Sequence, residues 1–256
     1  MRIFSLNLNS FDGTKNRFNT KIKRDDICLR KDRAKKIAEY IMNEKHKIDI
    51  AIFQEVDCLE GMCDFYVSIF EQAGYKKIKL EILKKNTKFC NLIVAKSNPD
   101  IEVDPVKNDF SIIRLNRWLE VTINDKNATR KVNLLNFHRK DASDVYALLK
   151  YFKNRQDRDS IVIGDFNAAR NDHRDIQHKD SYIVYENTEF LNLFESLGYN
   201  EKGDKKFTFY NKEDKSDGRR IDHCFVSGDI SDCCECYTDE SLNGLTDHLA
   251  IVLDIE

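Results

Sequence analysis

The chain has 256 residues, with 42 basic and 44 acidic side chains and a formal net charge of −2 at pH 7. A purely electrostatic nucleic-acid binder would be strongly basic, so this charge balance argues against that class. A local basic surface at Lys31–Lys36 or Arg139–Lys140 is still compatible with the total. A domain of this length buries roughly three quarters of its unfolded surface and needs no disulfides. We expect a single domain over residues 1–256.

The first residues, Met1–Asn9, lack the basic segment, long hydrophobic run and cleavage site of a secretory signal peptide. We therefore expect a cytoplasmic protein whose eight cysteines are reduced. No stretch of about eighteen residues is hydrophobic and free of charge, so no membrane-spanning helix is expected. The cysteines at 233, 234 and 236 lack zinc-finger spacing, and we interpret them as structural.

Segments with the two-residue period of strands alternate with helical segments, and no linker rich in glycine, serine or proline interrupts them. At the start of the chain, hydrophobic and polar residues alternate, so Asn7 and Asn9 project to the same side. Further strands are expected at the hydrophobic runs 48–53, 89–95, 118–123, 132–137, 161–164, 219–226 and 249–255. Several runs are too close together for a crossover helix, so antiparallel pairs are required.

Three segments have the hydrophobic spacing of amphipathic helices. Their stripes lie within Ala34–Ile41, Val145–Phe152 and Phe190–Leu197, and Gly198 is a suitable end for the last of them. We interpret all three stripes as hydrophobic core. The polar segment Phe11–Arg30 is long for a connection and is predicted to be a loop that is functional, mobile or both.

Carboxylates, amides and histidines follow several of the predicted strands, and layered α/β proteins gather functional groups at such strand ends. Five places along the chain fit this pattern: Asn7 with Asn9, Gln54 with Glu55, His138, Gly164–Asn167, and Asp247 with His248. Asp222 differs because it lies within a predicted strand, where a buried carboxylate needs a partner.

Each of these residues alone is more often structural than catalytic. Together they supply oxygen ligands suited to Mg²⁺ or Mn²⁺, acidic groups that orient water, and histidines that contact phosphate. The phosphate-binding loop, dinucleotide-binding and serine-hydrolase motifs are missing from the sequence, which argues against those classes. The combination favours metal-assisted chemistry on a phosphate group.

Six short motifs stand in an order found in one superfamily. They are SLNLN at 5–9, IFQE at 52–55, NFH at 136–138, GDFN at 164–167, RIDH at 220–223 and TDH at 246–248. In these motifs the chain resembles the endonuclease/exonuclease/phosphatase superfamily, which includes exonuclease III, the AP endonucleases and deoxyribonuclease I. The resemblance implies an α/β (α+β) fold, a four-layered α/β sandwich in which two packed mixed β-sheets are flanked by helices. It places the site at one end of the sandwich.

The resemblance also implies roles for the residues at the strand ends. Glu55 would be the principal metal ligand, with Asn7 and Asp247 close to the metal or its water. Asp165 would orient or deprotonate the attacking water. Asn167 would donate to the phosphoryl oxygen or position Asp165.

Two histidines complete the implied site. His138 and His248 would contact the scissile phosphate, and Asp222 would pair with His248. Such a pair favours imidazolium and should raise the pKa of the histidine. Three further residues are predicted to contact substrate: Asn9, Arg139 and Phe209.

Two tracts favour a nuclease similar to exonuclease III and the AP endonucleases. The GDFNAA motif continues into the polar run Arg170–Asp175, and the aromatic tract Phe207–Tyr210 precedes GRRIDH. His138 stands where exonuclease III-type enzymes carry a tyrosine in a longer loop, so abasic-site specificity is not predicted. The inositol phosphatase signatures are replaced by GRRIDH and IGDFNAAR, which argues against phosphoinositide substrates.

We therefore predict a divalent-metal-dependent phosphodiester hydrolase that acts on nucleic acid, with DNA as the expected substrate and a monomer as the expected state. An RNA or small-molecule phosphodiesterase or phosphatase of the same fold is the alternative. A binding module that has lost catalysis is a third hypothesis, and the full set of site residues argues against it. The sequence leaves endo versus exo action and the number of metal ions open.

Overall fold

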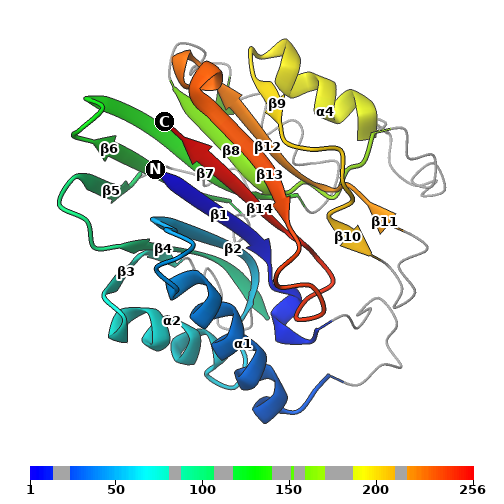
Figure 1. Ribbon diagram of the computed structural model, residues 1–256. Coiled ribbons are helices and arrows are strands. Elements are labelled where there is room, and N and C mark those ends of the chain that lie inside the picture. Colours follow the sequence, from blue (N-terminus) through cyan, green and yellow to red (C-terminus); the bar gives the residue numbers. More distant parts are fainter. Residues whose placement is uncertain are drawn as a thin grey trace.

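The computed structural model describes residues 1–13, 24–80, 88–106, 118–139, 151–152, 159–170, 187–210 and 218–256. Two six-stranded mixed β-sheets pack face to face, and helices lie on their outer faces (Figure 1). The N- and C-termini lie side by side, and the Met1 amine donates a hydrogen bond of 2.7 Å to the Ile255 carbonyl. The predicted α/β sandwich of two mixed sheets is confirmed.

The first sheet has the strand order β13-β14-β1-β2-β4-β3. In its centre β1 and β2 run parallel, and the other neighbouring pairs among the described strands are antiparallel. The strands are β1 (Arg2–Asn7), β2 (Ile50–Asp57), β3 (Tyr75–Leu80), β4 (Phe89–Lys96), β13 (Cys234–Asp239) and β14 (Ala250–Ile255).

The second sheet has the order β5-β6-β7-β8-β12-β9 and repeats this pattern, with β7 and β8 as the parallel pair in its centre. The strands are β5 (Ile101–Pro105), β6 (Trp118–Asp125), β7 (Arg130–His138), β8 (Ser160–Asp165), β9 (Asn200–Lys202) and β12 (Asp222–Ser227). A separate two-stranded ribbon pairs β10 (Phe209–Tyr210) with β11 (Gly218–Arg219).

Helices cover both outer faces of the sandwich. The described helices are α1 (Ile27–Met42), α2 (Met62–Gln72), α4 (Asn187–Ser196) and the short 3-10 helices η1 (Asn9–Phe11) and η3 (Asp229–Cys233). The side chain of Asp26 caps α1 by accepting hydrogen bonds from the backbone N–H groups of Cys28 and Leu29. The spacing-based prediction of a helix over Phe190–Leu197 is confirmed by α4.

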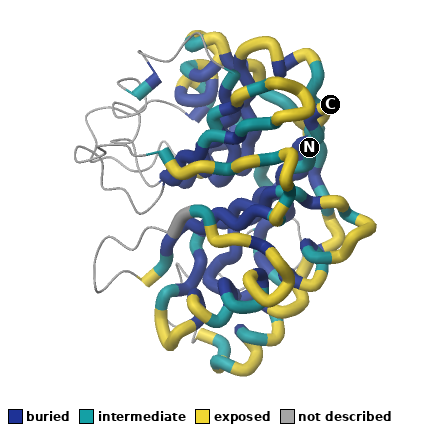
Figure 2. The backbone as a smooth tube through the Cα atoms, turned by 90° about the vertical axis from the view of Figure 1, so that its left-hand side faces the viewer, coloured by how far each residue is buried: buried dark blue, intermediate teal, exposed yellow. Residues whose placement is uncertain are grey.

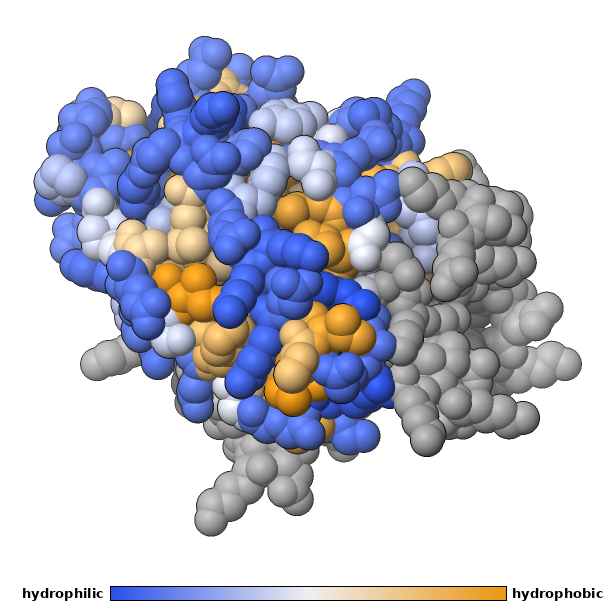
Figure 3. Space-filling model, turned by 60° about the horizontal axis from the view of Figure 1, so that its bottom comes forward, coloured by the Kyte–Doolittle hydropathy of each residue, from blue (hydrophilic) through white to orange (hydrophobic). Residues whose placement is uncertain are grey.

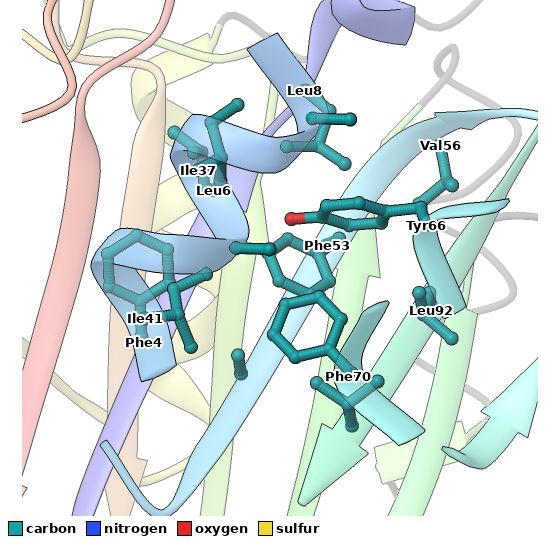
Figure 4. Packing of buried hydrophobic residues seen from close by; sticks show 14 of the residues in the cluster. Phe4, Leu6, Leu8, Ile37, Ile41, Phe53, Val56, Tyr66, Phe70 and Leu92 are labelled. Atoms are coloured by element: carbon teal, nitrogen blue, oxygen red, sulfur yellow. The ribbon is translucent and has the colours of Figure 1, made fainter. Parts of the chain in front are cut away.

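Three hydrophobic clusters separate four layers. One lies between the first sheet and helices α1 and α2, where Phe53, Tyr66 and Phe70 pack together (Figure 4). The second fills the space between the sheets, and the third joins the second sheet to α4. Along β2, Ile52 belongs to the cluster between the sheets and Phe53 to the helix-side cluster, as the period of two requires. Figure 2 shows buried residues along the inner strands and exposed ones on the outer elements.

Several sequence expectations need correction. Helix α1 begins at Ile27, so the predicted loop Phe11–Arg30 was wrong at its end, while residues 14–23 lie outside the described residues. The predicted strand over 219–226 is broken into β11 and β12, because Thr208 Oγ1 accepts hydrogen bonds from the backbone N–H groups of Ile221 and Asp222. The predicted helix over Val145–Phe152 is described only at residues 151–152.

Few large hydrophobic side chains of the described residues are exposed. On the face shown in Figure 3, hydrophobic residues form separate groups among hydrophilic ones. The exposed large hydrophobic side chains of the described residues are Leu29, Leu59 and Phe207. Among the described helices, none combines the length and the hydrophobicity that a membrane crossing requires.

Candidate active site

The predicted site residues meet at one edge of the two sheets. Asn7, His138 and Asp165 end β1, β7 and β8, three central strands that belong to the two parallel pairs. Asp222 begins β12, and Asp247 and His248 lie just before β14, separated from it by Leu249. The C-terminal end of a strand lies beside the N-terminal ends of its antiparallel neighbours, so the strand topology brings these residues to the same edge.

A hydrogen bond between Asn7 and Asp165 joins the two sheets at this edge. Asn7 Nδ2 donates to Asp165 Oδ2 over 2.9 Å, and the Asn7 side-chain oxygen accepts from the Asn9 backbone N–H, also over 2.9 Å. The Thr246 hydroxyl donates to the Asn7 carbonyl over 2.8 Å. These contacts fix the side-chain amide of Asn7. Its oxygen already accepts one hydrogen bond, and because an amide oxygen has two lone pairs, the second lone pair is still available as an acceptor.

Glu55 reaches the site because β2 contains a bulge. The pairing of β2 with β4 shifts register between Phe53 and Val56, and Glu55 adopts a left-handed backbone with φ 52°. Without the bulge, Glu55 would point to the same side as Phe53, into the helix-side cluster. The extra residue gives that inward position to Val56 and turns Glu55 toward the site. Glu55 Oε1 then lies 3.6 Å from His138 Nε2.

Asn167 holds Asp165 in place. Its backbone N–H donates to Asp165 Oδ1 over 2.8 Å, and its side-chain Nδ2 lies 3.1 Å from Asp165 Oδ2 and 3.0 Å from the Arg139 carbonyl oxygen. Asn167 has φ 47°, a left-handed conformation that asparagine adopts more readily than most residues. The turn after β8 therefore orients both oxygens of the Asp165 carboxylate.

Gly164 is required immediately before Asp165. A Cβ at this position would lie 2.1 Å from the Phe137 carbonyl oxygen, and the backbone has φ 143°. Glycine therefore allows β8 to approach β7 closely enough to bring Asp165 opposite His138 in the parallel register.

Asp222 and His248 form a buried pair. His248 Nδ1 is hydrogen-bonded to Asp222 Oδ2 over 2.9 Å, and His248 Nε2 lies 3.9 Å from Asp247 Oδ1. Burial lowers the pKa of His248, but the charge and hydrogen bond of Asp222 outweigh it and raise the pKa to about 10. His248 is therefore an imidazolium at neutral pH and can donate through Nε2.

The surroundings of the Asp165 carboxyl raise its pKa and so favour its neutral form. Burial, followed by the nearby charge of Asp222, raises the pKa of Asp165 to about 7, although His248 and the Asn167 N–H act in the other direction. His138 Nε2 lies 3.8 Å from Asp165 Oδ2. A carboxyl with a pKa near neutrality suits general-base chemistry.

The three predicted substrate contacts have different surroundings. Arg139 is buried, with Nη1 donating to Asn187 over 3.0 Å and its guanidinium 4.2 Å from the Phe190 ring centroid. Asn9 is also buried and donates to the Gly13 carbonyl over 2.9 Å. Phe209 lies beside the site, with its ring centroid 5.0 Å from that of His248. Of the three, Phe209 is the side chain that packs against a catalytic candidate.

A polar network beneath the site was not assigned a role by the sequence. Gln54 Nε2 donates to Asn136 Oδ1 over 2.8 Å, and Asn136 Nδ2 donates to the Phe53 carbonyl over 3.0 Å. Both residues stand inside recognised motifs, IFQE and NFH, which was the available signal. Thr208 and Thr246 are further supports, since they bond to the backbones of Asp222 and Asn7.

The donor atoms suit a hard divalent cation. Within the described ranges, one group of three has all its ligand atoms within 4.8 Å: Asp165, Asp222 and His248. These side chains are almost fully buried, and the Asp222–His248 contact already occupies two of them. The side chains of Glu55 and Asp247 are more exposed, at 22% and 13%. Mg²⁺ keeps several waters and needs one or two carboxylates, so the more exposed acids suit it better.

Sequence comparison identifies the family. The sequence model of a family described as "Endonuclease-reverse transcriptase" matches residues 122–252, slightly more than half of the chain. The chain belongs to this family, within the endonuclease/exonuclease/phosphatase superfamily. The matched range begins in β6 and includes His138, Asp165 and His248, whereas Asn7 and Glu55 lie before it. A comparison with curated protein sequences gives no match.

Solved structures share the fold of this superfamily member at low sequence identity. The endonuclease domain of TRAS1, a telomere-specific non-LTR retrotransposon, has a TM-score of 0.64 and 17% identity, with 100% of this chain and 97% of that chain covered. The 3′ phosphatase NExo from Neisseria, bound to a product DNA hairpin, has 0.66 and 15%, covering 100% and 99%. The AP endonuclease LMAP from Leishmania major has 0.66 and 13%, covering 98% and 86%.

Proposed function

We propose that this protein is a divalent-metal-dependent phosphodiesterase that cleaves DNA. The observation that carries the proposal is the convergence of both sheets on one polar site, in which Asn7 of the first sheet donates to Asp165 of the second. A partly exposed carboxylate, a carboxyl with a pKa near neutrality and an imidazolium surround the same position. This combination supports hydrolysis of a phosphate ester.

In the proposed reaction, Asp165 accepts a proton from the attacking water. Its Oδ1 and Oδ2 are held by Asn167, and Oδ2 is also held by Asn7, so the carboxylate is oriented before substrate arrives. A carboxyl with a pKa of about 7 is ionised in about half of the molecules at neutral pH, so it can accept a proton and return it afterwards.

The two histidines act on the phosphate. His248, kept cationic by Asp222, donates from Nε2 to a non-bridging phosphate oxygen. His138 lies between Glu55 and Asp165, within 3.6 and 3.8 Å of their carboxylate oxygens, and so faces the same space. Positioned donors of this kind stabilise charge that develops in the transition state.

Glu55, with Asp247 and Asn7, would hold a Mg²⁺ or Mn²⁺ ion. When bound, such an ion offsets negative charge on the phosphate and the leaving oxygen, which is worth several kcal/mol. The bulge in β2 turns Glu55 toward the site. Among the acidic side chains of the site, that of Glu55 is the most exposed, so its carboxylate is accessible to a hydrated ion.

DNA is supported as the substrate by two observations. One neighbour in fold is a 3′ phosphatase bound to a DNA hairpin, and another is an AP endonuclease. In addition, aromatic side chains lie on and next to the β10–β11 ribbon beside His248, and Phe207 there is 51% exposed. Exposed rings next to a phosphate site suit stacking on bases.

A substrate panel tests the proposal. The purified chain is incubated with plasmid, single-stranded, abasic and 3′-phosphorylated hairpin DNA, and separately with RNA, mononucleotides and sugar phosphates, in Mg²⁺ or Mn²⁺ and in EDTA. We expect metal-dependent release of product from at least one DNA substrate. Turnover confined to RNA or small phosphoesters would favour the alternative substrate class, and no metal-dependent turnover on any substrate would refute the proposal.

A further inference from the structure

His223 is a buried residue of the RIDH motif that has no part in the reaction proposed above. It lies in β12 directly after Asp222 and is the register partner of Gly164 in β8. Successive residues of a strand point to opposite faces of the sheet. His223 therefore shares a face with Phe225, which packs in the cluster beside α4, whereas Asp222 faces the site. An effect of His223 on the reaction has to pass through the residues that it contacts.

Both ring nitrogens of His223 lie against hydrogen-bond acceptors. Nε2 is 2.8 Å from the Ala168 carbonyl oxygen, and Nδ1 is 2.7 Å from Glu201 Oε1. The pKa of Glu201 is about 2 despite its burial, so this group is a carboxylate at neutral pH. A carbonyl oxygen and a carboxylate accept hydrogen bonds and cannot donate them, so both ring nitrogens are N–H donors.

The carboxylate of Glu201 is itself held by Arg170. The arginine donates to Glu201 Oε2 from Nε over 3.0 Å and from Nη2 over 2.8 Å. It also bonds to α4, where Asn192 and Glu195 accept from its Nη1 and Nη2, each over 2.6 Å. A chain of polar contacts thus runs from α4, on the outer face of the second sheet, to the His223 ring (Figure 1).

The contacts of His223 lie on both sides of Asn167, in the turn that orients Asp165. Before Asn167, the Phe166 ring packs edge-on against the His223 ring, with 5.4 Å between the centroids. After it, the Ala168 carbonyl accepts from His223 Nε2. Between these contacts, the Asn167 backbone N–H donates to Asp165 Oδ1 over 2.8 Å. His223 therefore holds the two residues that flank the one bonded to Asp165.

We propose that His223 is a positioning residue for Asp165 and acts through the turn from Phe166 to Ala168. The role concerns the same site and rests on the function proposed above. Asn167 has a left-handed backbone, a conformation that persists only where its surroundings enforce it. The hydrogen bond from His223 to Ala168 supplies this restraint. Without it the turn relaxes and the Asp165 carboxylate is misplaced, while the groups that contact the phosphate stay where they are.

Two substitutions separate the two hydrogen bonds of His223. Glutamine places its amide nitrogen near the position of Nε2 and retains a donor for Ala168. Asparagine places its amide nitrogen near the position of Nδ1 and retains only the contact with Glu201. We expect His223→Gln to keep kcat close to the wild-type value. We expect His223→Asn to lose on the order of a hundredfold in kcat with little change in KM. Circular dichroism checks that both variants are folded.

A second measurement does not depend on hydrolase activity. Hydrogen exchange, followed by NMR, reports whether the Asn167 backbone N–H stays bonded to Asp165. We expect slow exchange in the wild type and in His223→Gln, and roughly tenfold faster exchange in His223→Asn. If the wild type cleaves no substrate, the proposed function fails, and the exchange of Asn167 still decides whether His223 holds the turn.

Three results would overturn this role. The first is the same kcat in His223→Gln and His223→Asn, or the same exchange rate of the Asn167 N–H. The second is a raised KM with an unchanged kcat in His223→Asn, because His223 would then act on substrate binding. The third needs no variant and applies even if His223→Asn does not fold. In the wild type the Nε2 proton of His223 should be visible by NMR and protected from exchange, and its absence would remove the donor to Ala168.

Discussion

Asp165 and Asp222 face each other as register partners across the antiparallel pair of β8 and β12. The two buried carboxylates have unequal surroundings, because Asp222 is hydrogen-bonded to His248 while Asp165 is held by the neutral amides of Asn7 and Asn167. Burial and the Asp222 charge raise the pKa of Asp165. Asp222 is thus paired with the His248 imidazolium, whereas Asp165 can take up a proton.

Replacing Asp222 with asparagine should lower the pKa of His248 and reduce kcat. Without the carboxylate, the pKa of His248 falls from about 10 toward its ordinary value, so the imidazolium is lost at lower pH. We expect kcat to fall by about a hundred- to ten-thousand-fold and the alkaline limb of the pH–rate profile to move to lower pH. Circular dichroism checks that the variant is folded. A profile with unchanged limbs would show that Asp222 does not tune His248.

Gly164→Ala should destabilise the protein more than alanine at other left-handed glycines. The new Cβ meets the Phe137 carbonyl oxygen, and relief requires β7 and β8 to separate. We expect a loss on the order of 3 kcal/mol in the free energy of unfolding, measured in urea. Gly198→Ala is the control, because it also has a positive φ but no atom within 4 Å, and it should lose roughly 1 kcal/mol. Equal losses would refute the close-approach explanation.

Tyr66→Phe should leave the protein as stable or more stable. In the described part of the chain, no group hydrogen-bonds to the buried Tyr66 hydroxyl, so its removal eliminates a desolvation penalty of about 1 kcal/mol. Tyr75→Phe is the matched control, because that hydroxyl donates to the Ile48 carbonyl over 3.1 Å and its loss should cost about 1 kcal/mol. Thermal unfolding compares the two, and a lower Tm for Tyr66→Phe than for Tyr75→Phe would contradict this explanation.

Glu201 should contribute a pH-dependent part of the stability. Burial would raise the pKa of Glu201, but His223, hydrogen-bonded at 2.7 Å, together with Arg220 and Arg170, lowers it to about 2. A depressed pKa stabilises the fold fully above the ordinary value of 4.5, and this contribution is lost as the pH falls toward 2. In Glu201→Gln, unfolding free energy should therefore change less between these pH values. The same slope in both proteins would exclude this contribution.

The sequence predicted which candidate residues lie at strand ends better than the direction of individual side chains. The period of two brought Asn7 to the correct strand end, and the chain order of the motifs indicated the sandwich. The bulge that aims Glu55 is a register shift against β4, which local periodicity does not contain. Arg139 follows the NFH motif, yet the long-range contacts with Asn187 and Phe190 decide its burial.

The elements that the pattern missed also have physical reasons. Strand β3 carries three lysines in six residues, so it lacks the hydrophobic alternation of an inner strand and sits at a sheet edge. Strand β9 has three residues, too few for a period to be visible.

The most direct measurement compares metal-dependent cleavage of DNA by the wild type and by Glu55→Gln, under single-turnover conditions over a Mg²⁺ titration. Glu44→Gln is the control, because it makes the same chemical change at a side chain that is 80% exposed and bonded to Lys96. We expect Glu55→Gln to lose at least about a hundredfold in rate and to need more Mg²⁺, while Glu44→Gln matches the wild type. Cleavage in EDTA, or an unchanged rate and Mg²⁺ requirement in Glu55→Gln, would contradict the proposed metal-dependent site.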